Sequence, residues 1–284
     1  MIPVGIIQSI ATNNSKINLS NAEQAIRRAA SGNAKVICLQ ELFQNQYFCQ
    51  TEDHKYFDLA QPIPGATTEQ LQMLAKELEV VIIASLFEKR TSGLYHNSVA
   101  VLDADGSYLG KYRKMHIPDD PGFYEKFYFA PGDLGYKVFD TRYARIGVLV
   151  CWDQWFPEAA RITAMMGAEI LFYPTAIGWD TSQDQKTNNE QYQAWKTIQK
   201  SHAIANGVHV VAVNRVGQED NIKFWGGSMA VNPFGTVLWE GDQQEVIQVI
   251  KLDLNQTGYY RNHWPFLRDR RTDSYQDITR RFID

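Results

Sequence analysis

The chain has 284 residues, of which 44% are hydrophobic, and its formal net charge is −4 at pH 7. This length and apolar content suffice for one large buried core, and the near-neutral charge gives no indication of a nucleic-acid or membrane partner. The three cysteines form no CxxC pair, which disfavours a disulfide framework or a zinc knuckle and favours a reducing cytoplasm.

Short apolar runs alternate with longer amphipathic stretches along the chain. Residues 1–7 lack a cationic region ahead of their apolar residues, so we expect a first strand rather than a signal peptide. The apolar runs predict strands at 4–10, 34–39, 80–87, 97–103, 144–150, 169–173, 208–214 and 246–252. The amphipathic stretches predict helices at 19–30, 67–78, 157–166 and 188–206.

No linker, repeat or break in composition interrupts this alternation, so we expect a single α/β domain over residues 1–284. Turn sequences at 103–106 and 232–235 lie between apolar runs and predict β-hairpins, which indicates mixed sheets. Segments 42–64 and 113–135 fit neither helix nor strand. Long structured loops in a compact domain often carry function.

One cysteine lies where a predicted strand meets a predicted helix. The apolar run 145–150 ends at Cys151, and the signal for a helix start comes at Pro157. A thiol near the positive end of a helix dipole is expected to have a lowered pKa and to face a substrate. A buried and unreactive strand cysteine is the alternative, and the strand alone does not decide between the two.

Two other predicted strands also end on an unusual polar residue. Glu41 follows the apolar run 36–39, and Lys114 follows residues 109–113 at the start of a long loop. A glutamate can take the proton of a thiol, the thiolate can attack a carbonyl, and a lysine can stabilise the oxyanion that forms. Taken singly, Glu41 also fits a surface cap or an ion pair, and Lys114 a solvated charge.

The sequences around these three residues resemble the signature regions of the nitrilase superfamily of carbon–nitrogen hydrolases. The matching segments are QELF at 40–43, YRKMH at 112–116 and VCWD at 150–153, and the resemblance runs in order over nearly the whole chain. It implies a four-layer α-β-β-α sandwich with two mixed sheets, no metal and no other cofactor. It also implies a homodimer or larger homo-oligomer, with residues from about 255 on forming a C-terminal tail that packs on a partner subunit.

The resemblance further implies roles for individual residues. Glu41 is expected to be the general base, Lys114 the oxyanion stabiliser and Cys151 the nucleophile. Glu125 matches a second glutamate that orients the lysine and the attacking water, although by itself it fits a loop salt bridge equally well. The backbone N–H of Trp152 is the expected second oxyanion donor.

One branch of the superfamily, the N-carbamoylputrescine amidohydrolases, matches in further segments at 47–50, 116–129, 151–158, 173–178 and 268–271. This likeness implies hydrolysis of a ureido substrate through a cysteine-bound carbamoyl intermediate, as in polyamine biosynthesis from agmatine. The primary ammonium of such a substrate needs an anion or an aromatic cage, and we expect Asp180 to bind it. The other expected substrate-binding residues are Trp152, Trp155, Tyr47 and Thr175, with Trp179 as a further candidate for the channel wall.

Other functions stay open at this point. Another amidase of the superfamily could act on a different carbamoyl amine, a carbamoyl amino acid or an ω-amide, and a carboxylate substrate would call for an arginine in the pocket. A non-catalytic binding protein could retain the fold, whereas a thiol redox protein would lack a plausible resolving cysteine. Thr272 stands where the branch usually has proline, and the sequence after Asp273 diverges, which leaves the packing of the tail open.

Overall fold

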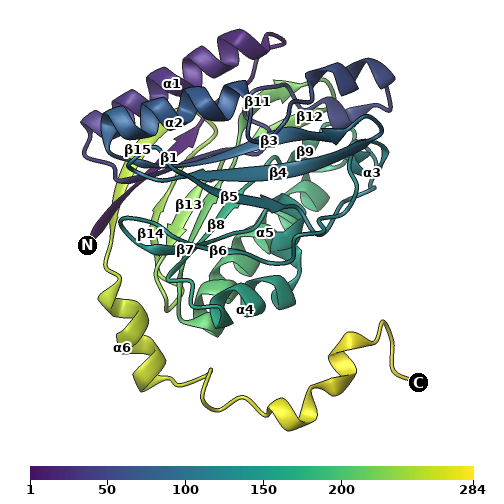
Figure 1. Ribbon diagram of the computed structural model, residues 1–284. Coiled ribbons are helices and arrows are strands. Elements are labelled where there is room, and N and C mark those ends of the chain that lie inside the picture. Colours follow the sequence, from purple (N-terminus) through teal and green to yellow (C-terminus); the bar gives the residue numbers. More distant parts are fainter.

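The apolar runs of the sequence form the strands of two mixed sheets in the computed structural model, which describes residues 1–284 (Figure 1). The first sheet has the order β15-β1-β2-β3-β4-β5. Its strands are β1 (Ile2–Gln8), β2 (Val36–Leu39), β3 (Val81–Thr91), β4 (Leu94–Leu102), β5 (Tyr108–Arg113) and β15 (Val246–Leu252). Strands β1, β2 and β3 run parallel, and the remaining neighbours pair antiparallel.

The second sheet repeats this arrangement, with the order β14-β13-β10-β8-β7-β6 and parallel pairing of β7, β8 and β10. Its strands are β6 (Val138–Asp140), β7 (Arg145–Val148), β8 (Ile170–Pro174), β10 (His209–Val213), β13 (Met229–Val231) and β14 (Val237–Glu240). A small third sheet consists of β9 (Gly178–Asp180), β11 (Val216–Glu219) and β12 (Ile222–Trp225).

Two pairs of helices cover the outer faces of the two large sheets. Helices α1 (Ser15–Ser31) and α2 (Ala66–Leu78) pack on the first sheet, and α4 (Pro157–Met165) and α5 (Gln185–Asn206) pack on the second (Figure 1). This confirms the predicted four-layer α-β-β-α sandwich with two mixed sheets. None of the helices combines the length and the apolar character that a membrane span requires.

Alternating side chains of each strand enter two different cores. In β2, Val36 and Cys38 face the opposite sheet, whereas Ile37 and Leu39 pack with α1 and α2. All four side chains are buried. Because both faces of the sheet are covered, the strand is apolar throughout, which is why a continuous run revealed it in the sequence.

The two segments that fit neither helix nor strand are irregular in the structure. Residues 42–64 contain only short 3₁₀ helices, and residues 113–135 contain the single turn α3 (Glu125–Tyr128). Their aromatic side chains form a separate buried cluster. The predicted hairpins are confirmed at 103–106, between β4 and β5, and at 232–235, between β13 and β14.

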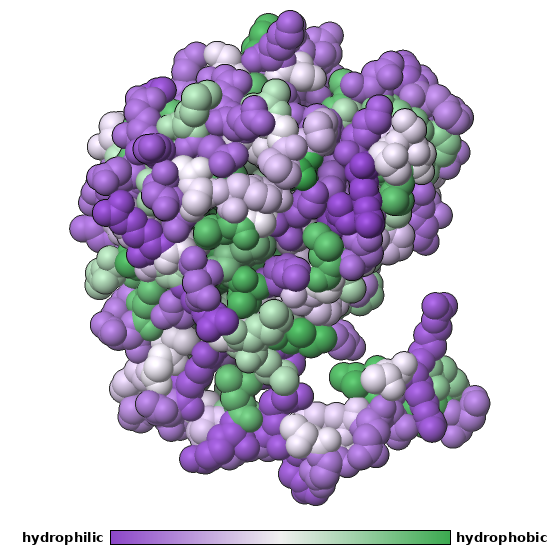
Figure 2. Space-filling model, in the orientation of Figure 1, coloured by the Kyte–Doolittle hydropathy of each residue, from purple (hydrophilic) through white to green (hydrophobic).

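The last thirty or so residues lie outside the sandwich. After β15 the chain forms α6 (Asn255–His263) and two short 3₁₀ helices, Thr272–Ser274 and Gln276–Thr279, which extend away from the sheets (Figure 1). Figure 2 shows apolar side chains on this tail and on the part of the sandwich beside it.

Candidate active site

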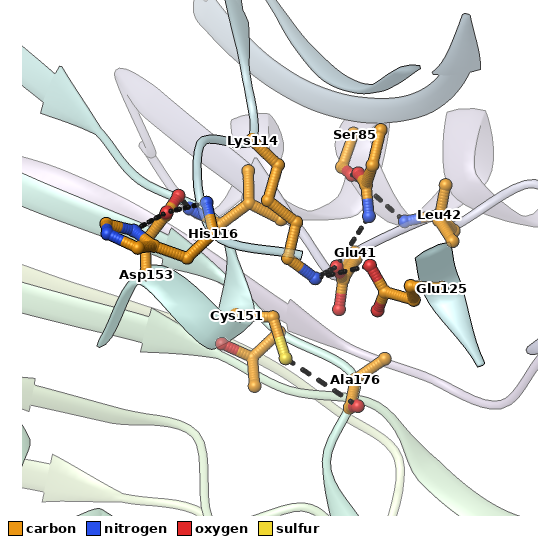
Figure 3. Close-up of polar contacts among 12 residues, drawn as sticks. Glu41, Leu42, Ser85, Lys114, His116, Glu125, Cys151, Asp153 and Ala176 are labelled. Carbon is orange, nitrogen blue, oxygen red and sulfur yellow. Dashed lines mark hydrogen bonds and ion pairs between the residues drawn. The ribbon is translucent and has the colours of Figure 1, made fainter. Parts of the chain in front are cut away.

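Glu41, Lys114 and Cys151 meet at one end of the sandwich. Glu41 follows β2 and Lys114 follows β5 in the first sheet, while Cys151 follows β7 in the second sheet. Figure 3 shows the three side chains converging from their separate strand ends. All three are buried. The structure therefore brings together the three residues that the sequence placed at strand ends.

The ammonium group of Lys114 lies between two carboxylates. Its Nζ donates hydrogen bonds to Glu41 Oε1 at 2.8 Å and to Glu125 Oε2 at 2.7 Å, and all three side chains are fully buried. Burial lowers the pKa of Lys114, but the attraction of Glu125 and Glu41 outweighs this effect and raises the pKa well above its ordinary value. Lys114 is therefore an ammonium at neutral pH.

A neutral donor adds one hydrogen bond to each carboxylate. The hydroxyl of Tyr47 donates to Glu125 Oε1 at 2.7 Å, and Asn97 Nδ2 donates to Glu41 Oε1 at 2.7 Å. Burial raises the pKa of Glu125 to about 7, although the Lys114 ammonium opposes this shift. The second glutamate thus titrates close to neutral pH.

Glu41 is fixed through its backbone as well as its side chain. The buried guanidinium of Arg215 donates to the carbonyl oxygen of Glu41 at 2.8 Å and forms an ion pair with Glu219 at 2.8 Å. The next residue, Leu42, donates its N–H to Ser85 Oγ at 3.0 Å. With Oε1 used by Lys114 and Asn97, Glu41 Oε2 is a buried oxygen without a hydrogen-bond partner, and it is free to accept a proton.

Cys151 has a strained backbone and no hydrogen bond to the charged network. Its φ is +39°, a left-handed value that residues with a side chain seldom adopt and that often marks functional sites. The thiol donates only to the carbonyl oxygen of Ala176, at 3.8 Å. The strain and the shortage of partners leave the sulfur available for chemistry.

The expectation that the strand–helix junction lowers the pKa of this thiol is wrong. Burial raises the pKa of Cys151 well above its ordinary value, and Glu41 adds to the effect while Lys114 opposes it. Cys151 begins a short 3₁₀ turn, Cys151–Trp155, and α4 starts only at Pro157, so the sulfur does not lie in the first turn of α4. A neutral thiol needs a base at the moment of attack, and Glu41 Oε2 is a buried carboxylate oxygen without a hydrogen-bond partner.

Asp153, the last residue of the VCWD segment, ties the turn of the cysteine to the segment after the lysine. Its buried carboxylate accepts hydrogen bonds from the N–H of Val150 at 2.9 Å and from the Tyr112 hydroxyl at 2.8 Å. It also accepts from the N–H of His116 at 3.0 Å and lies 2.7 Å from His116 Nδ1. This one carboxylate therefore holds both parts of the site in register.

A cavity of about 440 Å³ leads to Cys151. Trp152, Trp155 and Asp180 line it, as expected from the sequence, and so do Trp225 and Asp120, neither of which was expected to bind the substrate. The lining includes these two aspartates but no lysine, arginine or histidine. The cavity wall thus favours a cationic group over an anionic one.

One oxygen of Asp180 is already engaged. The N–H and the hydroxyl of Ser182 donate to Asp180 Oδ1 at 2.8 Å and 2.7 Å, which fixes the carboxylate and leaves Oδ2 free.

Trp179 lines an adjoining cavity that shares Trp225 and Gln183 with the one at Cys151.

Two residues expected in the substrate channel lie elsewhere. Tyr47 packs between Phe123 and Phe224, and its hydroxyl is used by Glu125. Thr175 is fully buried at the end of β8, where its hydroxyl donates to the carbonyl oxygen of Tyr173 at 2.9 Å. Neither lines the cavity. Tyr47 is therefore positioned to orient Glu125 rather than to contact a substrate.

No group of three or more His, Cys, Asp or Glu side chains is placed so that it could hold a metal ion.

Comparison with known proteins gives matches along almost the whole chain. A family model described as carbon–nitrogen hydrolase matches residues 4–262. An N-carbamoylputrescine amidase from Solanum lycopersicum is 46% identical over 286 residues, covering 97% of this chain and 94% of that protein. A citrullinase from Francisella tularensis is 41% identical over 287 residues, covering 99% of each. The crystal structure of a carbon–nitrogen hydrolase from Helicobacter pylori G27 has 46% sequence identity, covers 99% of each chain and gives a TM-score of 0.96.

The hydrogen bond from Tyr47 is expected to set the acidity of Glu125. It lowers the pKa of that carboxyl, so Tyr47→Phe should raise the pKa above about 7 and increase the protonated fraction at neutral pH. A hydrogen bond to a charged group is worth about 1.5 kcal/mol, which corresponds to an acid roughly tenfold weaker. Carbon-13 NMR of labelled glutamate, followed against pH, measures this change.

Tyr95→Phe is the matched control, because Tyr95 belongs to the same aromatic cluster but its hydroxyl makes no hydrogen bond within the chain. An identical Glu125 titration in wild type and Tyr47→Phe would contradict the assigned role of Tyr47.

Proposed function

Because the chain belongs to the carbon–nitrogen hydrolase family, we propose that it hydrolyses N-carbamoylputrescine to putrescine, carbon dioxide and ammonia. The observation that carries this proposal is the charge of the cavity at Cys151, which contains Asp120 and Asp180 and no basic side chain. A carboxylate recognises an ammonium by a charge-assisted hydrogen bond. The names of the plant relatives at 45–46% identity support the same substrate.

The proposed reaction starts with Cys151. Glu41 Oε2 takes the thiol proton while Sγ attacks the ureido carbon, which two nitrogens make a poor electrophile. Lys114 and the backbone N–H of Trp152 stabilise the oxyanion, so that preorganised charge compensates for the unreactive carbonyl. The tetrahedral species then expels an amine, which takes its proton from Glu41, and a carbamoyl group stays on the sulfur.

Water completes the cycle. Glu41 accepts a proton from a water molecule that attacks the carbamoyl carbon, the thiol is released, and the resulting carbamic acid breaks down to carbon dioxide and ammonia. Glu125 orients Lys114 and the attacking water, and its contact of 2.7 Å with Nζ supports this role. The same carboxylate, Glu41, thus acts as base and then acid in each half of the reaction.

The proposal also covers the domain organisation, the oligomeric state and the cellular location of the protein. Residues 1–284 form one domain whose tail, from about 255 on, packs on a partner subunit of a homodimer or larger homo-oligomer. The large apolar side chains of the tail support this, since Tyr259, Trp264 and Phe282 are 57%, 55% and 79% exposed. The three free cysteines fit a cytoplasmic enzyme of polyamine biosynthesis.

A panel of ureido compounds tests the choice of substrate, because the citrullinase relative makes citrulline a reasonable competitor. The α-carboxylate of citrulline would face Asp120 and Asp180 without a basic partner, and such repulsion costs several kcal/mol. We expect kcat/KM for N-carbamoylputrescine to exceed that for citrulline by about a hundredfold or more. Faster release of ammonia from citrulline or from N-carbamoyl-β-alanine would overturn the proposal.

The ammonium contact itself is tested at Asp180. Asp180→Asn removes the charge but keeps the size of the side chain, so KM for N-carbamoylputrescine should rise by about tenfold or more. N-Butylurea has the same ureido group and four-carbon chain without the ammonium, and its hydrolysis should change little. Equal losses with both substrates would show that Asp180 supports the site in another way.

A further inference from the structure

The cavity at Cys151 is larger than the proposed substrate requires. N-Carbamoylputrescine has nine non-hydrogen atoms, which occupy about 270 Å³ if each takes the roughly 30 Å³ of a water molecule in the liquid. The cavity has about 440 Å³. A longer chain therefore fits in the same space.

The same cavity has one carboxylate more than the proposed substrate uses. Asp120 lines it together with Asp180, and its side chain forms no ion pair and no hydrogen bond within the chain. The two acids belong to neighbouring segments, because Gly122 lies against Ile222 and Ile222 pairs with Asp180 between β12 and β9. One wall of the cavity thus carries two negative charges without a counterion.

The neighbouring acid shows that this placement is specific. Asp119 faces Lys126, with 3.9 Å between its carboxylate and Nζ, and it does not line the cavity. Only one of the two adjacent aspartates is therefore directed to the space at Cys151. The indole side chains of Trp155 and Trp225, which line the same space, add apolar surface for methylene groups and faces that attract ammonium ions.

We propose that the active-site cavity also accepts monocarbamoylated triamines, with Asp120 as the residue that binds their terminal ammonium. This inference rests on the proposed function, since Cys151 attacks the same ureido group, the triamine leaves as the expelled amine, and water then releases the carbamoyl group as carbon dioxide and ammonia. The secondary ammonium, four carbons from the ureido nitrogen, occupies the position of the putrescine ammonium at Asp180. The terminal ammonium, three carbons farther on, pairs with Asp120.

The cavity volume accommodates this longer substrate. Spermidine carbamoylated on its aminobutyl end has thirteen non-hydrogen atoms, or about 390 Å³ on the same scale, and fits within the cavity of about 440 Å³.

The test compares kcat/KM for carbamoylspermidine with that for N-carbamoylputrescine, measured as ammonia release by the full chain. Wild type should hydrolyse both. Asp120→Asn should lower the ratio of kcat/KM for carbamoylspermidine to kcat/KM for N-carbamoylputrescine by about fivefold, because it removes a partly exposed ion pair. The ratio is used because a loss of folded protein lowers both values equally. Asp119→Asn removes an equal charge from the same loop outside the cavity and should leave the ratio unchanged.

Three results would overturn this inference. Wild type could fail to hydrolyse carbamoylspermidine while it hydrolyses N-carbamoylputrescine, which would leave the proposed function intact. Asp120→Asn could leave the ratio unchanged, or Asp119→Asn could lower it as much. Failure of wild type with both substrates would contradict the proposed function as well.

Discussion

A single buried ammonium organises the site. Lys114 lies between Glu41 and Glu125 with contacts of 2.8 Å and 2.7 Å, and the three side chains are fully buried. Taking such charges out of water is costly, and loss of one member would leave an unpaired buried charge. Because Lys114 follows β5 and Glu125 starts α3, the pairing fixes both ends of the loop between them.

The same pairing separates the roles of the two oxygens of Glu41. Oε1 accepts from Lys114 and Asn97, whereas Oε2 has no partner. Burial raises the pKa of Cys151, so the resting sulfur is a thiol and its proton must leave during attack. A carboxylate that is fixed through one oxygen and has the other oxygen free is suited to accept the thiol proton while the sulfur attacks. In the proposed function, the acidic cavity selects which ureido compound reaches that thiol.

The sequence predicted the parts of this arrangement that depend on buried strands. Glu41 and Cys151 follow continuous apolar runs, so their places at strand ends were visible, whereas Glu125 was found only through family resemblance. The contacts of Asp153 could not be predicted, because Tyr112 and His116 come from a segment distant in sequence. Asp120 lies in an irregular loop, so its direction toward the cavity could not be predicted either. The strands of the third sheet are short and partly polar, as in β11 (Val216–Glu219), and form no apolar run. Side-chain direction in a loop has no periodicity. The sequence therefore could not show that Tyr47 contacts Glu125 instead of lining the substrate channel.

In the proposed reaction, Cys151 carries the carbamoyl group during turnover. Acid-quenching the enzyme in the presence of N-carbamoylputrescine, followed by peptide mass spectrometry, measures this intermediate. A peptide containing Cys151 should gain the mass of one carbamoyl group, and peptides containing Cys38 or Cys49 should not. Steady turnover with an unmodified Cys151 peptide at every quench time, or an adduct on another cysteine, would contradict the proposed reaction.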